Sequence, residues 1–98
     1  MKIRLESRGG VTGRPMIRQL VTDGLSPEAR NLRRMLDDGQ FWGGSDTILS
    51  RTPKPWDAEL KLTVEDGGRT RTIKLHKSAA NPGLQRVVER MEELPPTA

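Results

Sequence analysis

The sequence predicts an α+β domain, with a four-stranded, mainly antiparallel sheet, two helices on one face and the order ββαββα. Two pairs of alternating apolar and polar segments are each joined by a glycine-rich turn, as in antiparallel hairpins. Each pair is followed by a segment of helical periodicity that opens on a capping residue and a proline. Because each sheet face and each helix stripe is apolar only once, both helices are expected on the same face.

Length and composition indicate one domain, residues 1–98, with a modest core. The charged fraction is 31% and the hydrophobic fraction 33%, a polar composition that is still compatible with folding. The absence of cysteine excludes disulfides and thiolate metal sites. The first residues lack a continuous apolar run, and no segment approaches transmembrane length. We therefore expect a cytoplasmic protein without a signal peptide or a membrane partner.

The first predicted strand covers residues 2–7, where Ile3 and Leu5 share one face. It leads into a glycine-rich segment, residues 8–15, which we call the first loop. Three glycines within five positions allow positive φ angles, and the apolar Val11 stands between two arginines. Taken alone, this composition favours an ordinary hairpin turn over a presented binding loop.

The second strand is predicted at residues 15–22, but its inward phase is ambiguous. Ile17 and Val21 share one phase, and Met16 and Leu20 share the other. A bulge would reconcile the two phases, and the sequence does not decide between these alternatives.

The first helix is predicted over residues 27–38. Ser26 is a suitable N-cap, and the proline that follows it fits the first helical position. Leu32 and Leu36 lie on one face of this helix, and Gly39 is a natural C-terminal stop.

Phe41 and Trp42 follow this helix and are expected to close the core there. Residues 43–56, which we call the second loop, have no clear period and contain two glycines, two prolines and four hydroxyl residues. A loop of this length in a compact domain is usually functional or disordered. Its one apolar pair is Ile48 and Leu49.

The second hairpin is the clearest pattern in the chain. Alternation predicts strands at residues 58–65 and 69–76, joined by an Asp-Gly-Gly turn at residues 66–68. In the second of these strands, Ile73 and Leu75 share the inward phase.

The second helix is predicted over residues 82–93, because Asn81 and Pro82 form another cap-plus-proline start. Its apolar stripe is Leu84, Val87, Val88 and Met91. Residues 94–98 contain two prolines and are expected to fray.

The residue inventory disfavours an enzyme. His76, the only histidine, lies in the outward phase of its strand and is predicted to be a surface residue. A metal site would need further ligands, and the hydroxyl residues of the second loop have no histidine in their own segment to act as a base. The first loop leads into a strand, whereas phosphate-binding glycine loops lead into a helix. No metal and no cofactor are expected.

A small basic nucleic-acid-binding module is the alternative function, since the net charge is +4. Ten cations could coat the outer sheet face and the loops: Arg8, Arg14, Arg18, Arg51, Lys54, Lys61, Arg69, Arg71, Lys74 and Lys77. However, acidic residues interleave with them, and Trp56 is the only aromatic residue left for base stacking. A nucleic-acid partner is therefore disfavoured. A binding module that presents both loops at the same end of the sheet fits the sequence better.

Several segments, in their order and spacing, resemble the emfourin family of small bacterial inhibitors of protealysin-like (thermolysin-type) zinc metalloproteases. They are Arg4-Leu5-Glu6-Ser7-Arg8-Gly9-Gly10-Val11-Thr12-Gly13, then Leu25-Ser26, Phe41-Trp42 and Val64-Glu65-Asp66-Gly67-Gly68-Arg69-Thr70. The resemblance covers nearly the whole chain. Family members often carry an aromatic residue after the glycine pair, where this chain has Val11.

The resemblance implies a reversible, competitive inhibitor that is a monomer when free and binds a protealysin-like metalloprotease 1:1. Such proteases favour a bulky apolar side chain just after the scissile bond, and Val11, Ile48 or Leu49 could supply it. The expected protease-binding residues are Arg8, Gly9, Gly10, Val11, Thr12, Gly13, Arg14, Ser45, Asp46, Thr47, Ile48, Leu49, Ser50 and Arg51. No residue is expected to be catalytic.

Overall fold

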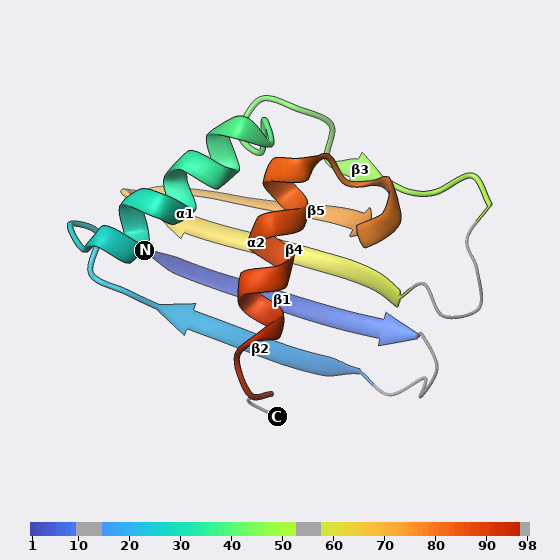
Figure 1. Ribbon diagram of the computed structural model, residues 1–98, viewed down its shortest axis with the longest axis horizontal. Helices are drawn as coiled ribbons and strands as arrows, with labels where there is room; N and C mark the ends of the chain where they lie inside the picture. The colour runs from blue at the N-terminus through green and yellow to red at the C-terminus, as the bar shows by residue number, and fades with distance from the viewer. Residues whose placement is uncertain (10–14, 53–57, 97–98) are drawn as a thin grey trace.

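Five strands form one sheet in the computed structural model, which describes residues 1–9, 15–52 and 58–96. Across the sheet their order is β2-β1-β4-β5-β3 (Figure 1). The elements are β1 (Lys2–Gly9), β2 (Met16–Val21), α1 (Pro27–Asp38), β3 (Thr47–Ile48), β4 (Ala58–Asp66), β5 (Arg69–His76), the short 3-10 helix η1 (Lys77–Ala79) and α2 (Pro82–Glu92). The predicted α+β class, both hairpins and both helices are confirmed.

The structure corrects the predicted strand count from four to five. Thr47 and Ile48 form β3, which pairs in parallel with β5 opposite Lys74 and Leu75. A two-residue strand is too short to produce a periodic pattern, so it was hidden inside the segment predicted to be irregular. The element order is therefore ββαβββα.

The pairing of β1 with β2 decides the phase of β2. The register is continuous, so no bulge is present. Leu20 lies opposite the buried Ile3 and packs against the core, whereas Val21 is 68% exposed. Met16 and Leu20 therefore occupy the helix-covered face, and Ile17 lies with Val21 on the open face.

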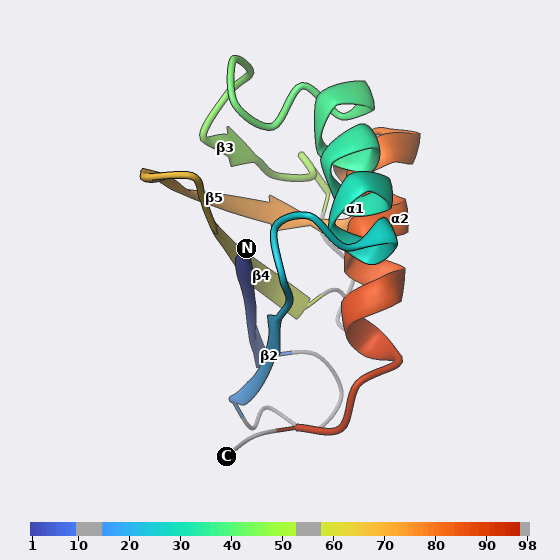
Figure 2. The same cartoon turned by 90° about the vertical axis from the view of Figure 1, so that its left-hand side faces the viewer.

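Both helices cover the same face of the sheet, and the opposite face stays open (Figure 2). The predicted N-caps are confirmed: the Ser26 hydroxyl accepts from the Ala29 N–H at 3.2 Å, and the Asn81 side chain accepts from the Leu84 N–H at 3.0 Å. Such caps satisfy amides that have no partner within the helix.

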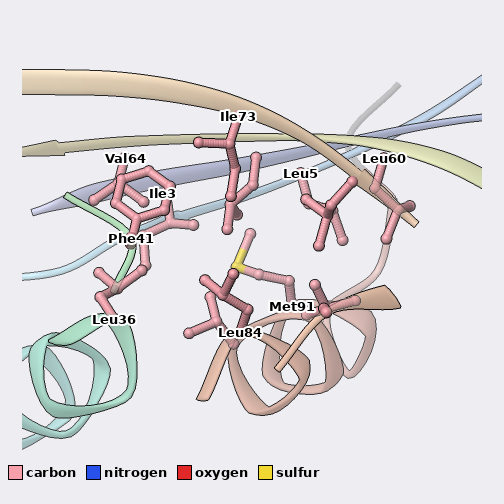
Figure 3. Packing of buried hydrophobic residues seen from close by; sticks show 14 of the residues in the cluster. Ile3, Leu5, Leu36, Phe41, Leu60, Val64, Ile73, Leu84 and Met91 are labelled. Carbon is pink, nitrogen blue, oxygen red and sulfur yellow. The ribbon is translucent and has the colours of Figure 1, made fainter. Parts of the chain in front are cut away.

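The core lies between the helices and the sheet. Figure 3 shows Leu84 and Met91 of α2 pointing toward the apolar side chains of the strands. The buried cluster comprises Ile3, Leu5, Leu32, Leu36, Phe41, Leu60, Leu62, Val64, Ile73, Leu75, Ala80, Leu84, Val87, Val88 and Met91. Phe41 closes the core as predicted, and Trp42 packs partly buried against it, with its ring centroid 5.1 Å from that of Phe41.

The tail predicted to fray from residue 94 is held at its first residue. Leu94 packs against the core, and its carbonyl oxygen accepts a hydrogen bond from Arg18 Nε at 3.0 Å. Arg18 can reach this carbonyl because it lies on the helix-covered face of β2, opposite Leu5.

One ion pair ties α1 to the turn of the second hairpin. Arg33 donates to both carboxylate oxygens of Asp66, at 2.8 and 2.9 Å, and to the carbonyl of Gly24 at 2.6 Å. Asp66 is only 7% exposed. The hydrogen bonds from Arg33 lower the pKa of Asp66, with the charge of Arg33 adding to this effect and burial opposing it.

This pair predicts an acid-dependent part of the stability. Because the pKa of Asp66 is lower in the folded state, its contribution is present above about pH 4 and is lost as the pH falls through the folded-state pKa. Asp66→Asn should lower the free energy of unfolding at pH 7 and flatten its decline in acid, as measured by urea unfolding from pH 7 to pH 2. Glu65→Gln, at the exposed neighbouring position, is the control. Parallel pH profiles of Asp66→Asn and the wild type would contradict the prediction.

Candidate functional site

The described ends of the two loops lie at the same end of the sheet. Gly9, which ends β1, is paired with Ala58, which begins β4. β5 also ends there, because His76 is paired with Glu59 (Figure 1). The condition for a two-part surface, that both loops leave the sheet at one end, is therefore met by the residues that flank them.

The first part of the second loop is fixed along β5. The guanidinium of Arg71 donates to the carbonyl oxygens of Trp42 and Gly44, and the Lys74 N–H donates to the Asp46 carbonyl at 2.9 Å. These bonds lead the chain into β3. Residues 44–48, within the segment predicted to be irregular, are thus ordered by backbone and side-chain contacts with one strand.

The apolar pair of the second loop is divided between the core and the surface. Ile48 pairs with Leu75 and packs partly buried against the core, whereas Leu49 is 45% exposed. Of the two side chains of the second loop that were proposed for an apolar pocket, only Leu49 therefore presents an exposed surface.

The edge of the sheet is followed by Ser45, Asp46 and Thr47, which come before the end of the sheet where Gly9 pairs with Ala58. The Ser45 hydroxyl donates to the Thr47 carbonyl at 2.9 Å and accepts from the Thr47 N–H at 3.2 Å. The Asp46 carboxylate accepts from the Thr47 hydroxyl at 3.3 Å. These exposed residues form a local turn that sets the direction in which the chain enters β3.

His76 is not the surface residue that the sequence predicts. It is 9% exposed, and its Nδ1 accepts a hydrogen bond from the Ser50 N–H at 2.9 Å. Strand alternation predicts its outward phase correctly, but the backbone of the second loop lies against it there. The histidine therefore fixes Ser50 of the second loop to the end of β5.

Two cations of the proposed surface are exposed. Arg8 forms an ion pair with Glu6 at 3.2 Å, and Arg51 extends from the second loop. Beside Arg8, the open face has a hollow of about 90 Å³, lined by Glu6, Arg8, Glu59, Leu60, Lys61 and Lys74. Because its lining contains both acidic and basic side chains, the hollow does not favour a ligand of one charge. The predicted contact residues Gly10, Val11, Thr12, Gly13 and Arg14 lie outside the described residues.

Three cations assigned to a nucleic-acid surface do not face the open side of the sheet. Arg18 and Arg71 bind backbone carbonyls on the helix-covered side, and Arg69 lies 4.1 Å from the centroid of the Trp42 ring. This part of the prediction is wrong, because alternation places all three residues in the inward phase. The remaining exposed cations interleave with Glu59 and other acids.

Arg71 and His76 are the site-forming residues that the sequence interpretation missed. The signal for Arg71 was present, since it shares the inward phase of Ile73 and Leu75, where a charged residue needs partners. The signal for His76 was absent, because a strand pattern does not show which distant backbone will cover a position.

The described residues contain no arrangement for metal chemistry. Within residues 1–9, 15–52 and 58–96, no three His, Asp or Glu side chains group so as to hold a metal ion. In the same part of the chain, neither helix is long and apolar enough to cross a membrane.

Comparison with known proteins gives one result. The family model described as Emfourin matches residues 5–92, which include every strand and both helices apart from the first residues of β1. No curated protein and no solved structure matches the chain.

Proposed function

We propose, because this chain belongs to the Emfourin family, known as protein inhibitors of M4 metalloproteases, that it inhibits such a protease reversibly and competitively through its two loops. Members of this family are protease inhibitors and not enzymes. In the proposed complex, both loops enter the active-site cleft and exclude substrate.

The observation that carries this proposal is the pairing of Gly9 with Ala58. It supports a single contact surface made from two segments that are distant in sequence. Two adjacent loops on a rigid sheet suit the standard size of inhibitor interfaces, about 800 Å² on each partner.

Leu49 and Val11 are the proposed apolar contacts, one from each loop. Leu49 is 45% exposed although its neighbour Ile48 is fixed in β3. A backbone that is fixed one residue before Leu49 reduces the conformational freedom lost on binding, which favours affinity. Thermolysin-type proteases favour a bulky apolar side chain next to the scissile bond, and an apolar anchor of this kind could occupy the pocket that receives it.

Arg8, Arg14 and Arg51 form the proposed cationic rim of this surface. Exposed charges at the edge of an interface mainly increase the rate of association with a partner of opposite charge. The ion pair between Arg8 and Glu6 reduces this contribution from Arg8. We therefore expect raised salt to slow association with the protease more than it speeds dissociation.

We further propose a 1:1 complex with a chain that is monomeric when free. Mixing the protein with an M4 metalloprotease, followed by size-exclusion chromatography with light scattering, tests both statements. A free dimer, or a complex with two copies of either chain, would contradict them.

Leu49→Asp tests the second loop directly. We expect it to weaken inhibition by about 30-fold or more, because truncated anchor residues at interfaces cost 2 kcal/mol or more and a buried charge adds to that cost. The inhibition constant is measured at fixed protease concentration over a range of inhibitor concentrations.

Leu25→Asp is the matched control, since Leu25 is 81% exposed in the turn before α1, at the other end of the sheet. It should inhibit like the wild type. If Leu49→Asp retains full inhibition while its circular dichroism and thermal unfolding are unchanged, the second loop is not the contact. If the wild type does not inhibit any M4 protease tested, the function itself is wrong.

A further inference from the structure

We propose that neutral His76 holds residues 49–52 of the second loop in their binding conformation, and that protonation of His76 releases these residues and weakens protease binding. This inference rests on the proposed function and adds a pH-dependent control of the same surface. It starts from the hydrogen bond of 2.9 Å between the Ser50 N–H and His76 Nδ1, at a side chain that is 9% exposed.

The bond requires one protonation state of the imidazole. Nδ1 accepts only when the ring is neutral and carries its proton on Nε2. In the protonated ring both nitrogens are donors, so the Nδ1–H of His76 would face the N–H of Ser50. The attraction then becomes a repulsion between two donors, and a buried charge is added at the same place.

The bond lies where it can control the exposed part of the second loop. Ser50 follows Leu49 directly, and the Ser50 hydroxyl accepts from the Thr52 N–H at 3.3 Å. Residues 50–52 therefore form a short local turn, and the bond to His76 connects this turn to β5. Without it, β3 still fixes Ile48, but the direction of Leu49 is no longer set by the Ser50 amide.

The charged groups that face His76 come from β4, from β5 and from the turn at residues 50–52. Glu59 lies opposite it on β4, Lys61 and Lys74 lie on the same face, and Arg51 is the charged residue of the turn. Histidine is the side chain that ordinarily changes its charge between about pH 5 and 8, and this chain has a single histidine and no cysteine. The amino terminus is bonded to the Thr22 carbonyl at the other end of the sheet.

The first experiment needs no protease. In ¹H–¹⁵N spectra of the free protein between pH 7.5 and 5.5, the Ser50 amide should shift, and its protection against exchange with solvent, relative to an unprotected amide at the same pH, should fall. Its titration curve should coincide with that of the His76 ring protons, which are unambiguous because the chain has one histidine. A Ser50 amide that does not follow the ring titration would overturn the inference.

The second experiment compares dissociation constants at pH 7.5 and pH 5.5 for the wild type and two variants. His76→Asn places an amide oxygen near the position of Nδ1, so it can accept from Ser50 at either pH. His76→Phe keeps a flat ring without an acceptor. Measuring all three with the same protease cancels the protease's own response to pH.

We expect the wild type to bind about tenfold more weakly at pH 5.5, since a partly buried N–H that loses its partner costs on the order of tenfold in affinity. The Asn variant should bind nearly as well as the wild type at pH 7.5. The ratio of its dissociation constant at pH 5.5 to that at pH 7.5 should be about tenfold smaller than the same ratio for the wild type. The Phe variant should be weaker at both values. If His76 only supported the fold, the Asn variant would keep the pH dependence of the wild type.

The outcomes separate the two proposals. If the wild type fails to bind at pH 7.5, the proposed function is wrong, and the amide titration still judges the His76–Ser50 bond. If the wild type binds, but its dissociation constant changes between pH 7.5 and pH 5.5 by the same factor as that of the Asn variant, the inference is overturned and the function stands. If the Phe variant does not fold, the comparison of wild type with Asn decides alone.

Discussion

Gly83→Ala is expected to lower the free energy of unfolding by about 2–3 kcal/mol and the melting temperature by about 10–20 °C. At Gly83 the backbones of α1 and α2 touch. An added Cβ would lie 2.5 Å from the Gly39 nitrogen and 2.7 Å from the Met35 carbonyl oxygen. These are backbone atoms of another helix, so they cannot move aside as a flexible side chain would.

The contact is supported from both helices. A Cβ at Gly39 would in turn lie 2.9 Å from the Leu84 nitrogen, and the Asn81 amide donates to the Gly39 carbonyl at 2.9 Å. The crossing of α1 and α2 therefore requires glycine at both positions. Thermal and urea unfolding followed by circular dichroism measure the effect.

Helix propensity predicts the opposite sign for this variant. Within a helix, alanine is more favourable than glycine by about 1 kcal/mol. Stabilisation of Gly83→Ala would therefore contradict the close crossing of the helices. Gly43→Ala is the control, because a Cβ at Gly43 would meet nothing within 4 Å, and we expect a change of no more than about 0.5 kcal/mol.

Combining Val11→Asp with Leu49→Asp is expected to weaken protease inhibition by about 1,000-fold. Each single substitution is expected to weaken inhibition by about 30-fold. Because the two residues belong to separate loops, the two losses of binding free energy should add. Inhibition constants of both single variants and the double variant measure this additivity.

The matched double control carries Val21→Asp and Leu25→Asp. Val21 is 68% exposed and Leu25 81% exposed, and both lie at the end of the sheet opposite Gly9. The control tests for the effect of two added charges on inhibition and should leave it unchanged. A loss of inhibition in the control as large as in the loop variant would remove the assignment of the surface to the two loops.

The helices and hairpins could be predicted because their signals are local. Ser26 and Asn81 cap their helices as the sequence suggests, each followed by a proline at the helix start. The turn between β4 and β5 has positive φ angles of 58° at Gly67 and 85° at Gly68, which glycine adopts without steric cost. Such signals operate within a few residues and survive any tertiary arrangement.

The fifth strand could not be predicted, because tertiary contacts create it. Thr47 and Ile48 have no alternation of their own and become a strand only because β5 offers a free edge. The phase of β2 was open for a related reason. Both of its faces carry apolar residues, and only pairing with β1 selects Leu20 over Val21 as the inward residue.

The arrangement of the two segments proposed as the candidate site was predictable in outline. Its two segments were recognised from glycine content, length and lack of period, and the pairing of Gly9 with Ala58 places their ends together. The supporting contacts were not recognised, because Arg71 and His76 act on backbone groups that are distant in sequence. A side-chain bond to a remote carbonyl or amide leaves no spacing that a sequence pattern could reveal.

Hydrogen–deuterium exchange of the free inhibitor and of its complex with an M4 metalloprotease tests the central claim most directly. If the two loops form the contact, binding should slow exchange in residues 8–14 and 49–52. Exchange in the turn between β2 and α1 should remain as in the free protein. Protection confined to that turn or to the outer faces of α1 and α2, with both loops unchanged, would contradict the proposed surface.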